Sequence, residues 1–381
     1  MTYRKRIIIL SVVICILFLI LVSPYIIWHF SSSRPTSFLI VDKTVPKPTY
    51  REHKALMWVL NNLKYTNKQP EKAYQFDQDY YGFFPSDNFT YSIKYLEPDP
   101  GHVDLIYLAD TYGVYNEDFY KENIRGKRSH LIYGGLEQKE LDIIETLLEK
   151  STLLIGEFNT FATPTYRLTG SRLENLFGVR WSGWIGRYFQ DLDKNNEELP
   201  VWLITNYEKQ YEAKWDFKGP GFGFVHIDDS VIILKHGEDV GNELIKVVFS
   251  EQAEKALKVR NNAGYYYWFD ILTPKSNTEI LAQYKLDVTE KGREKLEKFG
   301  IPNTFPAVVR TGSPYRTYYF AGDFSDIRKV PTFWNASFLK YLMARSYRDI
   351  ASDQSFFFWN VYYPMLENIL KKELKPESGK A

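Results

Sequence analysis

Residues 102–110 read His102-Val-Asp-Leu-Ile-Tyr-Leu-Ala-Asp110, a nearly continuous apolar run that ends in a carboxylate. Runs of this length and composition are typical of strands that are buried on both faces of a sheet. Two further runs have the same form, one at residues 37–42 that ends in Asp42 and one at residues 152–157 that ends in Glu157. The sequence therefore predicts several buried strands whose last residues are acidic.

Amphipathic helices are expected between these strands. In residues 50–63, Leu56, Val59, Leu60 and Leu63 recur at the spacing of one helix face, and residues 137–150 show a similar stripe. Strands that alternate with helices form βαβ units, which place the strands parallel with helices on both faces of the sheet. We therefore predict an α/β fold with a mainly parallel sheet over residues 37–199.

The pattern changes near residue 200. Short strands are predicted at 202–204, 223–227, 231–235 and 264–270, with a hairpin turn at 228–230, so residues 200–275 are interpreted as a strand-rich insertion. Residues 276–372 are predicted to complete the α/β domain. That part contains a strand at 279–284, a helix from Thr289 to Gly300, a strand pair at 305–309 and 316–322, and a closing helix at 356–372. Residues 373–381 form a polar tail.

The N-terminal region has the composition of a membrane span. Residues 7–30 are 24 positions without Asp, Glu, Lys or Arg, enough to cross the ~30 Å hydrocarbon core of a bilayer. Arg4, Lys5 and Arg6 precede this segment, and serines follow it. We predict a cytoplasmic N-terminus (1–6), a signal anchor that contacts the lipid bilayer (7–30), a linker (31–36) and a single-pass protein whose main domain is extracytoplasmic. A cleaved signal peptide is the alternative, but no A-x-A-like site follows the run.

Composition excludes several classes of function. The 381 residues contain 48 Lys and Arg against 47 Asp and Glu, a balance that argues against a nucleic-acid-binding protein. The one cysteine, Cys15, lies inside the predicted anchor, so no disulfide framework or zinc-thiolate site is expected. An outside domain without cysteine pairs indicates a bacterial envelope protein. Aromatic residues are unusually frequent, at 17%.

The order of these segments resembles the class I glutamine amidotransferase-like superfamily. The resemblance rests on the strand ending at Asp42, residues 104–110, the pair Gly134-Gly135 and residues 153–157, and it covers residues 36–190 and 278–372. Residues 318–323 resemble the final strand of catalytically silent members. The resemblance implies a flavodoxin-like or amidotransferase-like sheet.

Active members of that superfamily carry a nucleophilic cysteine at a strand-to-helix elbow and a histidine near the end of the domain. Here the elbow at 157–161 reads Glu-Phe-Asn-Thr-Phe, and the last histidine in the chain is His236. The resemblance therefore implies a silent member without glutaminase activity.

Candidate site residues follow from the strand ends, because ligands bind at the carboxyl ends of parallel strands. Asp110, Glu157 and Asp323 are the candidates for catalysis, in which two of them would act as an acid/base pair. The candidates for ligand binding are Asp42, Tyr112, Asn159, Trp181, Trp184 and Arg187. The competing interpretation is structural: the acids cap turns and helices, and the indoles fill core space.

Metal and cofactor sites are not expected. His226 and His236 flank the predicted hairpin, but their separation does not place them on one face. No Walker loop, GxGxxG, HExxH or GxSxG pattern is present.

Three functional hypotheses remain open. The first is a binding or assembly role in envelope or surface-polysaccharide biogenesis, with glycans or envelope-biogenesis proteins as partners. The second is a carbohydrate-active hydrolase or lyase that uses Asp110 and Glu157, with Asp323 as a further candidate. The third is a structural domain that contacts a partner membrane protein through the anchor.

Overall fold

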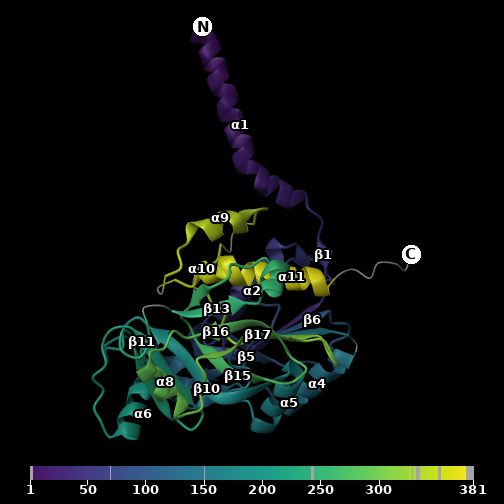
Figure 1. The fold of residues 1–381 in the computed structure, drawn as a ribbon. Coiled ribbons are helices and arrows are strands. Elements are labelled where there is room, and N and C mark those ends of the chain that lie inside the picture. The colour runs from purple at the N-terminus through teal and green to yellow at the C-terminus, as the bar shows by residue number, and fades with distance from the viewer. Residues whose placement is uncertain are drawn as a thin grey trace.

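A computed structural model describes residues 3–68, 70–149, 151–241, 244–327, 329–331, 335–350 and 353–374. It has a mixed α/β body from which one long helix, α1 (Tyr3–Phe30), projects (Figure 1). Of the expected N-terminus and polar tail, residues 1–2 and 375–381 lie outside the described residues.

The body is organised around a ten-stranded sheet. Its central strands β18, β9, β6, β2 and β4 pair in parallel, and the strands on either side pair antiparallel. The expectation of an α/β fold with a parallel centre is thereby confirmed. In spatial order the strands are β14 (Ala263–Tyr265), β13 (Ile245–Phe249), β16 (Glu279–Lys285), β17 (Thr304–Thr311), β18 (Thr317–Phe320), β9 (Leu153–Gly156), β6 (Leu105–Asp110), β2 (Phe38–Asp42), β4 (Tyr81–Ser86) and β5 (Thr90–Lys94).

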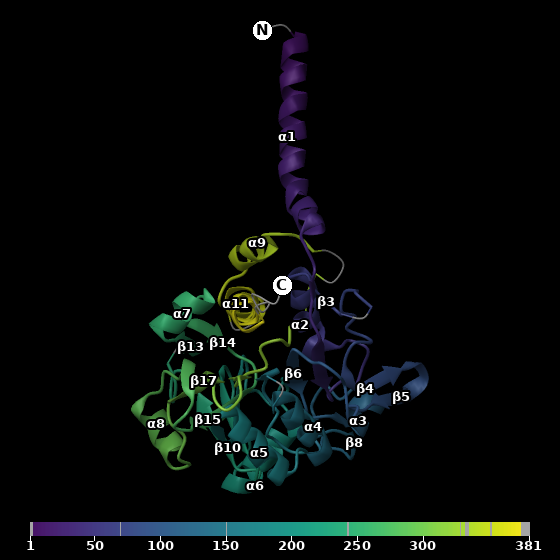
Figure 2. The ribbon, with the colours of Figure 1, turned by 90° about the vertical axis from the view of Figure 1, so that its right-hand side faces the viewer.

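The parallel strands form where the apolar runs predict them. Every residue of β2, β6 and β9 is buried, as expected for strands covered on both faces. Figures 1 and 2 show α2 (Arg51–Asn62) and α11 (Tyr363–Glu373) between the sheet and α1, with α4 (Gln138–Glu149) and α5 (Arg167–Phe177) on the far side.

A second, four-stranded antiparallel sheet flanks the first. Its order is β12 (Val231–Lys235), β11 (Gly221–His226), β10 (Val179–Phe189) and β15 (Phe269–Pro274). The predicted hairpin at 228–230 joins β11 to β12. The strands of residues 200–275 therefore divide between the two sheets, since β13 and β14 belong to the larger one.

Two local predictions are wrong. Residues 202–204 lie in helix α6 (Val201–Tyr211), not in a strand, because Pro200 starts the helix and Leu203 packs into a small apolar core beside β11 and β12. Residues 264–270 do not form one strand. They are divided between β14 and β15, which belong to different sheets and leave 266–268 as the connection.

Shorter elements complete the chain. The cap of Thr289 is confirmed, because its side chain accepts a hydrogen bond from the Gly292 amide at the start of α8 (Glu290–Glu297). The closing helix contains a π-helical turn just before Pro364. The remaining elements are β1 (Arg34–Pro35), β3 (Tyr65–Thr66), a 3₁₀ turn (Asp87–Phe89), β7 (Val114–Tyr115), α3 (Asn116–Tyr120), β8 (Leu131–Tyr133), α7 (Glu251–Leu257), α8 (Glu290–Glu297), α9 (Leu339–Ser346), α10 (Ser355–Phe357) and the π turn (Phe358–Tyr362).

Helix α1 is long and apolar enough to cross a membrane, and none of its most apolar window is buried in the body. Its last turns are attached to the body. The indole Nε1 of Trp28 donates to the carbonyl oxygen of Asn62 (2.8 Å), and the Lys64 ammonium lies 3.9 Å from the centre of the Trp28 ring. Strand β1, within the expected linker, pairs with β3.

Two glycines with the same positive φ provide a stability test. Gly178 ends α5 and Gly300 follows α8, and both have φ of 68°. A Cβ at Gly178 would lie 2.3 Å from Oγ1 of Thr278, whereas a Cβ at Gly300 would meet nothing within 4 Å. We expect Gly300→Ala to lower the free energy of unfolding by about 1 kcal/mol, from backbone strain alone.

Gly178→Ala should cost about 1–3 kcal/mol more, from overpacking. Urea denaturation of both variants measures the difference. Equal losses would contradict the packing of Gly178 against Thr278.

Candidate functional site

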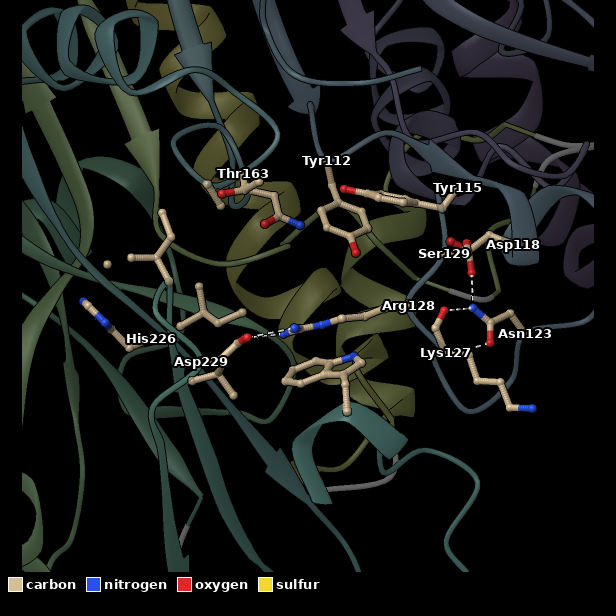
Figure 3. A pocket seen from close by; sticks show the side chains of 18 of the residues that line it. Tyr112, Tyr115, Asp118, Asn123, Lys127, Arg128, Ser129, Thr163, His226 and Asp229 are labelled. Atoms are coloured by element: carbon tan, nitrogen blue, oxygen red, sulfur yellow. Dashed lines mark hydrogen bonds and ion pairs between the residues drawn. The ribbon is translucent and has the colours of Figure 1, made fainter. Parts of the chain in front are cut away.

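A cleft of about 490 Å³ lies beside the ends of the parallel strands, between β6 and the second sheet. Figure 3 shows side chains converging on it from the loop after β6, from residues 123–129 and from the β11–β12 hairpin. Helix α6 closes one side. The lining residues are Tyr112, Tyr115, Asp118, Asn123, Gly126, Lys127, Arg128, Ser129, Asn159, Ala162, Thr163, Trp181, Gly183, Ile185, Trp202, Val225, His226, Ile227 and Asp229.

Aromatic rings supply much of the cleft's apolar surface. Tyr112 and Tyr115 pack with ring centres 4.8 Å apart, and Tyr112 keeps 39% of its surface exposed. Trp181 is held by a hydrogen bond from its Nε1 to the carbonyl oxygen of Trp184 (3.2 Å). Trp202 lies under the guanidinium of Arg128, 5.5 Å from its carbon. These rings are positioned by neighbours, so they form a prearranged surface.

An ion pair supplies the main charge of the cleft. Arg128 donates two hydrogen bonds to the Asp229 carboxylate, one of them 2.9 Å from Nη1 to Oδ2 (Figure 3). Asn206 also donates to Asp229 (3.2 Å). Both charged residues are about half exposed, so the pair offers donors and acceptors to a ligand at small cost in stability.

Asn159 lies in the elbow at residues 157–161. It follows β9, has φ of 70° and lines the cleft. Its carbonyl oxygen accepts a hydrogen bond from the Thr111 hydroxyl (3.0 Å), which fixes the turn. A side-chain amide hydrogen-bonds but does not act as a nucleophile. Asn159 therefore supplies hydrogen-bonding groups to the cleft.

The acidic strand ends gather behind the cleft rather than in its wall. Asp42 is fully buried: its Oδ1 accepts the Thr44 amide (2.8 Å), and its Oδ2 lies 2.5 Å from Nδ1 of His53. Nε2 of His53 faces the carbonyl oxygen of Phe76 (2.6 Å), so that nitrogen must carry a proton. Nδ1 of His53 faces the Asp42 carboxyl, so the two side chains form a buried pair. This pair holds β2 to α2.

Asp110 lies next to Asp42 and is 6% exposed. Its Oδ1 accepts the Thr44 hydroxyl (2.8 Å) and the Tyr112 amide (2.6 Å). Burial and the nearby charge of Asp42 raise the pKa of Asp110 to about 7. Asp110 thus fixes the backbone of Tyr112, which projects into the cleft.

Glu157 has no exposed surface. The Tyr107 hydroxyl donates to its Oε1, and the Ser325 amide (3.2 Å) and hydroxyl (2.9 Å) donate to its Oε2. Burial raises the pKa of Glu157 to about 7, although these hydrogen bonds favour the charged form. Both carboxyl oxygens of Glu157 thus accept hydrogen bonds from other residues of the protein.

Asp323 completes the set of acidic strand ends. Burial, followed by the charges of Asp326, Asp110 and Glu157, raises the pKa of Asp323 well above its ordinary value. Arg51 opposes this effect and pairs with Asp326 (2.8 Å from Nε to Oδ1). The four predicted strand-end acids therefore lie in one electrostatically connected group. Arg51 lines a second hollow, of about 800 Å³, that shares Tyr112, Asp118 and Asn123 with the cleft.

The structure separates the candidate ligand-binding residues into two groups. Tyr112, Asn159 and Trp181 line the cleft, and Asp42 does not. Trp184 is 5% exposed and packs between the rings of His226 and Phe299.

Arg187 is buried at 8% exposure, pairs with Glu198 and lies against the rings of Tyr267 and Trp268. The positive charge of Arg187 is therefore paired within the body.

Several lining residues were missed from the sequence: Arg128, Trp202 and Asp229 contribute the ion pair and an indole. Asp229 was considered only as a turn residue, and Trp202 was placed in a strand. The pair of Arg128 with Asp229 spans 101 positions, so no local pattern predicts it. Among the described residues, no group of three or more His, Cys, Asp or Glu is arranged to hold a metal ion.

Comparison with known proteins gives only distant likenesses. No family model matches the chain, and no curated protein matches it. A ThuA-like protein from Bacteroides uniformis ATCC 8492 is similar over 92% of this chain and 96% of its own, at 11% identity and a TM-score of 0.36.

A second ThuA-like protein, from Parabacteroides merdae ATCC 43184, is similar over 76% of this chain and 79% of its own (10% identity, TM-score 0.33). The beta-galactosidase from Rahnella sp. R3 is similar over 75% of this chain (9% identity, TM-score 0.31), and this chain spans 25% of that protein's length. Likenesses at these TM-scores do not assign the chain to a family. The resemblance to the amidotransferase-like superfamily remains a resemblance.

The raised pKa of Glu157 predicts a pH-dependent stability. The folded chain holds a proton on Glu157 up to about pH 7, whereas an unfolded chain releases it near 4.5. The folded state therefore binds more protons between these values, and the free energy of unfolding falls as the pH rises through them. The contribution is about 3 kcal/mol for the full shift.

Glu157→Gln should remove this part of the slope between pH 4.5 and 7 in urea titrations. Glu251→Gln changes an exposed glutamate and gives the reference slope. A Glu157→Gln slope equal to that of the wild type would show that burial does not raise the pKa.

Proposed function

We propose that this chain is a membrane-anchored, extracytoplasmic binding protein that holds a glycan in the cleft of Tyr112, Trp181 and Trp202. In this proposal it serves envelope or surface-polysaccharide biogenesis and has no glutaminase activity. The observation that carries the proposal is the chemistry of the cleft, where aromatic rings alternate with hydrogen-bonding groups.

Sugars offer apolar ring faces bordered by hydroxyl groups. The rings of Tyr112 and Trp181 suit such faces, and Arg128, Asp229 and Asn159 supply donors and acceptors around them. A volume of about 490 Å³ suits a short oligosaccharide segment. The cleft is held open by packed elements, which lowers the entropic cost of binding.

The remaining parts of the proposal rest on the N-terminal segment and the elbow. Helix α1 is long enough to span a bilayer, and the basic residues before it favour a cytoplasmic N-terminus. An extracytoplasmic body would meet surface polymers. Asn159 stands at the elbow in place of a thiol, which supports binding rather than acyl transfer.

The binding proposal is tested with full-length protein in detergent and an array of defined α- and β-linked oligosaccharides. For the oligosaccharide that binds the wild type best, Tyr112→Ala should weaken binding about tenfold, equivalent to about 1.4 kcal/mol, because a stacking ring is lost. Tyr166→Ala is the matched control, since Tyr166 is 76% exposed and does not line the cleft. Absence of binding to every oligosaccharide, or equal losses in the two variants, would overturn the proposal.

A carbohydrate-active hydrolase is the second candidate, and the raised pKa of Asp110 favours it. A carboxyl with pKa about 7 holds the proton that a general acid must donate. The complete burial of Glu157 opposes this candidate, because the second carboxyl is then out of contact with a substrate in the cleft.

Release of reducing ends from the same oligosaccharides separates the candidates. The binding proposal predicts no release by the wild type. Release that is lost in both Asp110→Asn and Glu157→Gln would instead establish the hydrolase.

A further inference from the structure

Helix α9 exposes an apolar face that the body does not use. Leu339 is buried and Met343 packs against the main core, so one side of the helix is fixed to the body. The opposite side carries Phe338, Tyr341 and Leu342, which are 62%, 58% and 63% exposed. Exposed apolar residues gathered on one helix face indicate contact with an apolar partner.

The position of α9 identifies that partner. Both views show α9 as the outermost element at the end of the body from which α1 projects, next to the base of α1 (Figures 1 and 2). The amide of Ser337 donates to the carbonyl oxygen of Pro24 in α1 (3.0 Å). Pro24 precedes the end of the apolar segment at Phe30 by six residues, about 9 Å of helix. The start of α9 is thus level with the last turns of the apolar span.

The charges nearby match the head-group region of a bilayer. A hollow of about 360 Å³ lies between the base of α1 and α9, and five basic residues and one acidic residue line it. The acidic residue, Glu367, is engaged by Lys340 and by Lys371 (2.6 Å). Arg345 at the end of α9 is exposed as well. The basic residues of the hollow are Arg34, Lys64, Lys258, Lys340 and Lys371.

From these observations we infer that α9 is an interfacial helix that docks the body onto the anionic surface of the same bilayer that α1 spans. Phe338, Tyr341 and Leu342 enter the boundary between head groups and acyl chains, and the basic hollow faces the anionic head groups. This inference rests on the proposed membrane anchor and adds a second contact to it.

The test uses full-length protein in vesicles of phosphatidylcholine and phosphatidylglycerol, with a nitroxide on a single cysteine. Leu342→Cys and Leu168→Cys, each in a Cys15→Ser background, form a matched pair, because Leu168 is 65% exposed on α5 at the opposite end of the body. The ratio of collision rates with oxygen and with a water-soluble nickel chelate reports the environment. We expect it to be about tenfold higher at 342 than at 168, because lipid admits oxygen and excludes the chelate.

Leu342 is exposed, so its replacement removes no core packing, and Tyr341→Cys repeats the measurement one position away. Native Cys15, labelled in the unsubstituted chain, tests α1 separately. Ratios at 342 and 341 equal to that at 168, with Cys15 in lipid, would overturn the docking of α9 and leave the anchor standing. Access of the chelate to Cys15 would overturn the anchor itself.

Vesicles of phosphatidylcholine alone test the electrostatic part. The ratio at 342 should fall several-fold in them, since the attraction between basic residues and an anionic surface is then lost. An unchanged ratio would show that the basic hollow does not face anionic head groups.

Discussion

The hydrogen bonds of the buried Glu157 carboxyl connect the central strands of the large sheet to one another. It follows β9 and receives hydrogen bonds from Tyr107 on β6 and from Ser325, so it links β9 to β6 and to the segment that follows β18. Tyr107 also contacts the hydroxyl of Tyr362 (3.0 Å), which brings the π turn of the C-terminal helix into the same network. Without these donors, a carboxyl in this place would have neither solvent nor a partner, at a cost of several kcal/mol.

The same network explains why the acidic strand ends do not form the cleft wall. Asp42 and Asp110 are used to hold the turns that follow β2 and β6, and the backbone of Tyr112 is one of the groups they hold. The acids therefore act on the cleft indirectly, through the position of an aromatic ring. The site interpretation and the structural interpretation of these acids each apply in part. The acids lie close together, and Asp42 and Asp110 also accept hydrogen bonds from amides of the turns that follow their strands. Burial and the neighbouring acidic charges raise the pKa of Asp110 and of Asp323 in this group.

Much of the fold could be predicted because the sequence patterns that indicate its strands and helices are local. The apolar runs of β2, β6 and β9 and the helix face of α2 are visible within a few residues, and each is where it was predicted. The break in 264–270 could not be seen, because the whole segment is aromatic and only its pairing in two sheets separates β14 from β15. Two of its five rings, those of Tyr265 and Phe269, have no exposed surface. The Arg128–Asp229 pair could not be predicted either, because it joins residues 101 positions apart that meet only in the folded chain.

The pairing of β1 with β3 turns the segment after α1 into a stiff connection rather than a loose tether. The amides of Arg34 and Thr36 donate to the carbonyl oxygens of Lys64 and Thr66 (2.7 and 2.9 Å), so the chain enters the body as part of its structure. Helix α6, which carries Trp202, lies at the end of the body farthest from α1 (Figures 1 and 2). In the proposed membrane-anchored arrangement, the cleft would stand at a set distance from the lipid, with the depth of the body as a spacer. A glycan bound there would be held by units that lie away from the membrane surface.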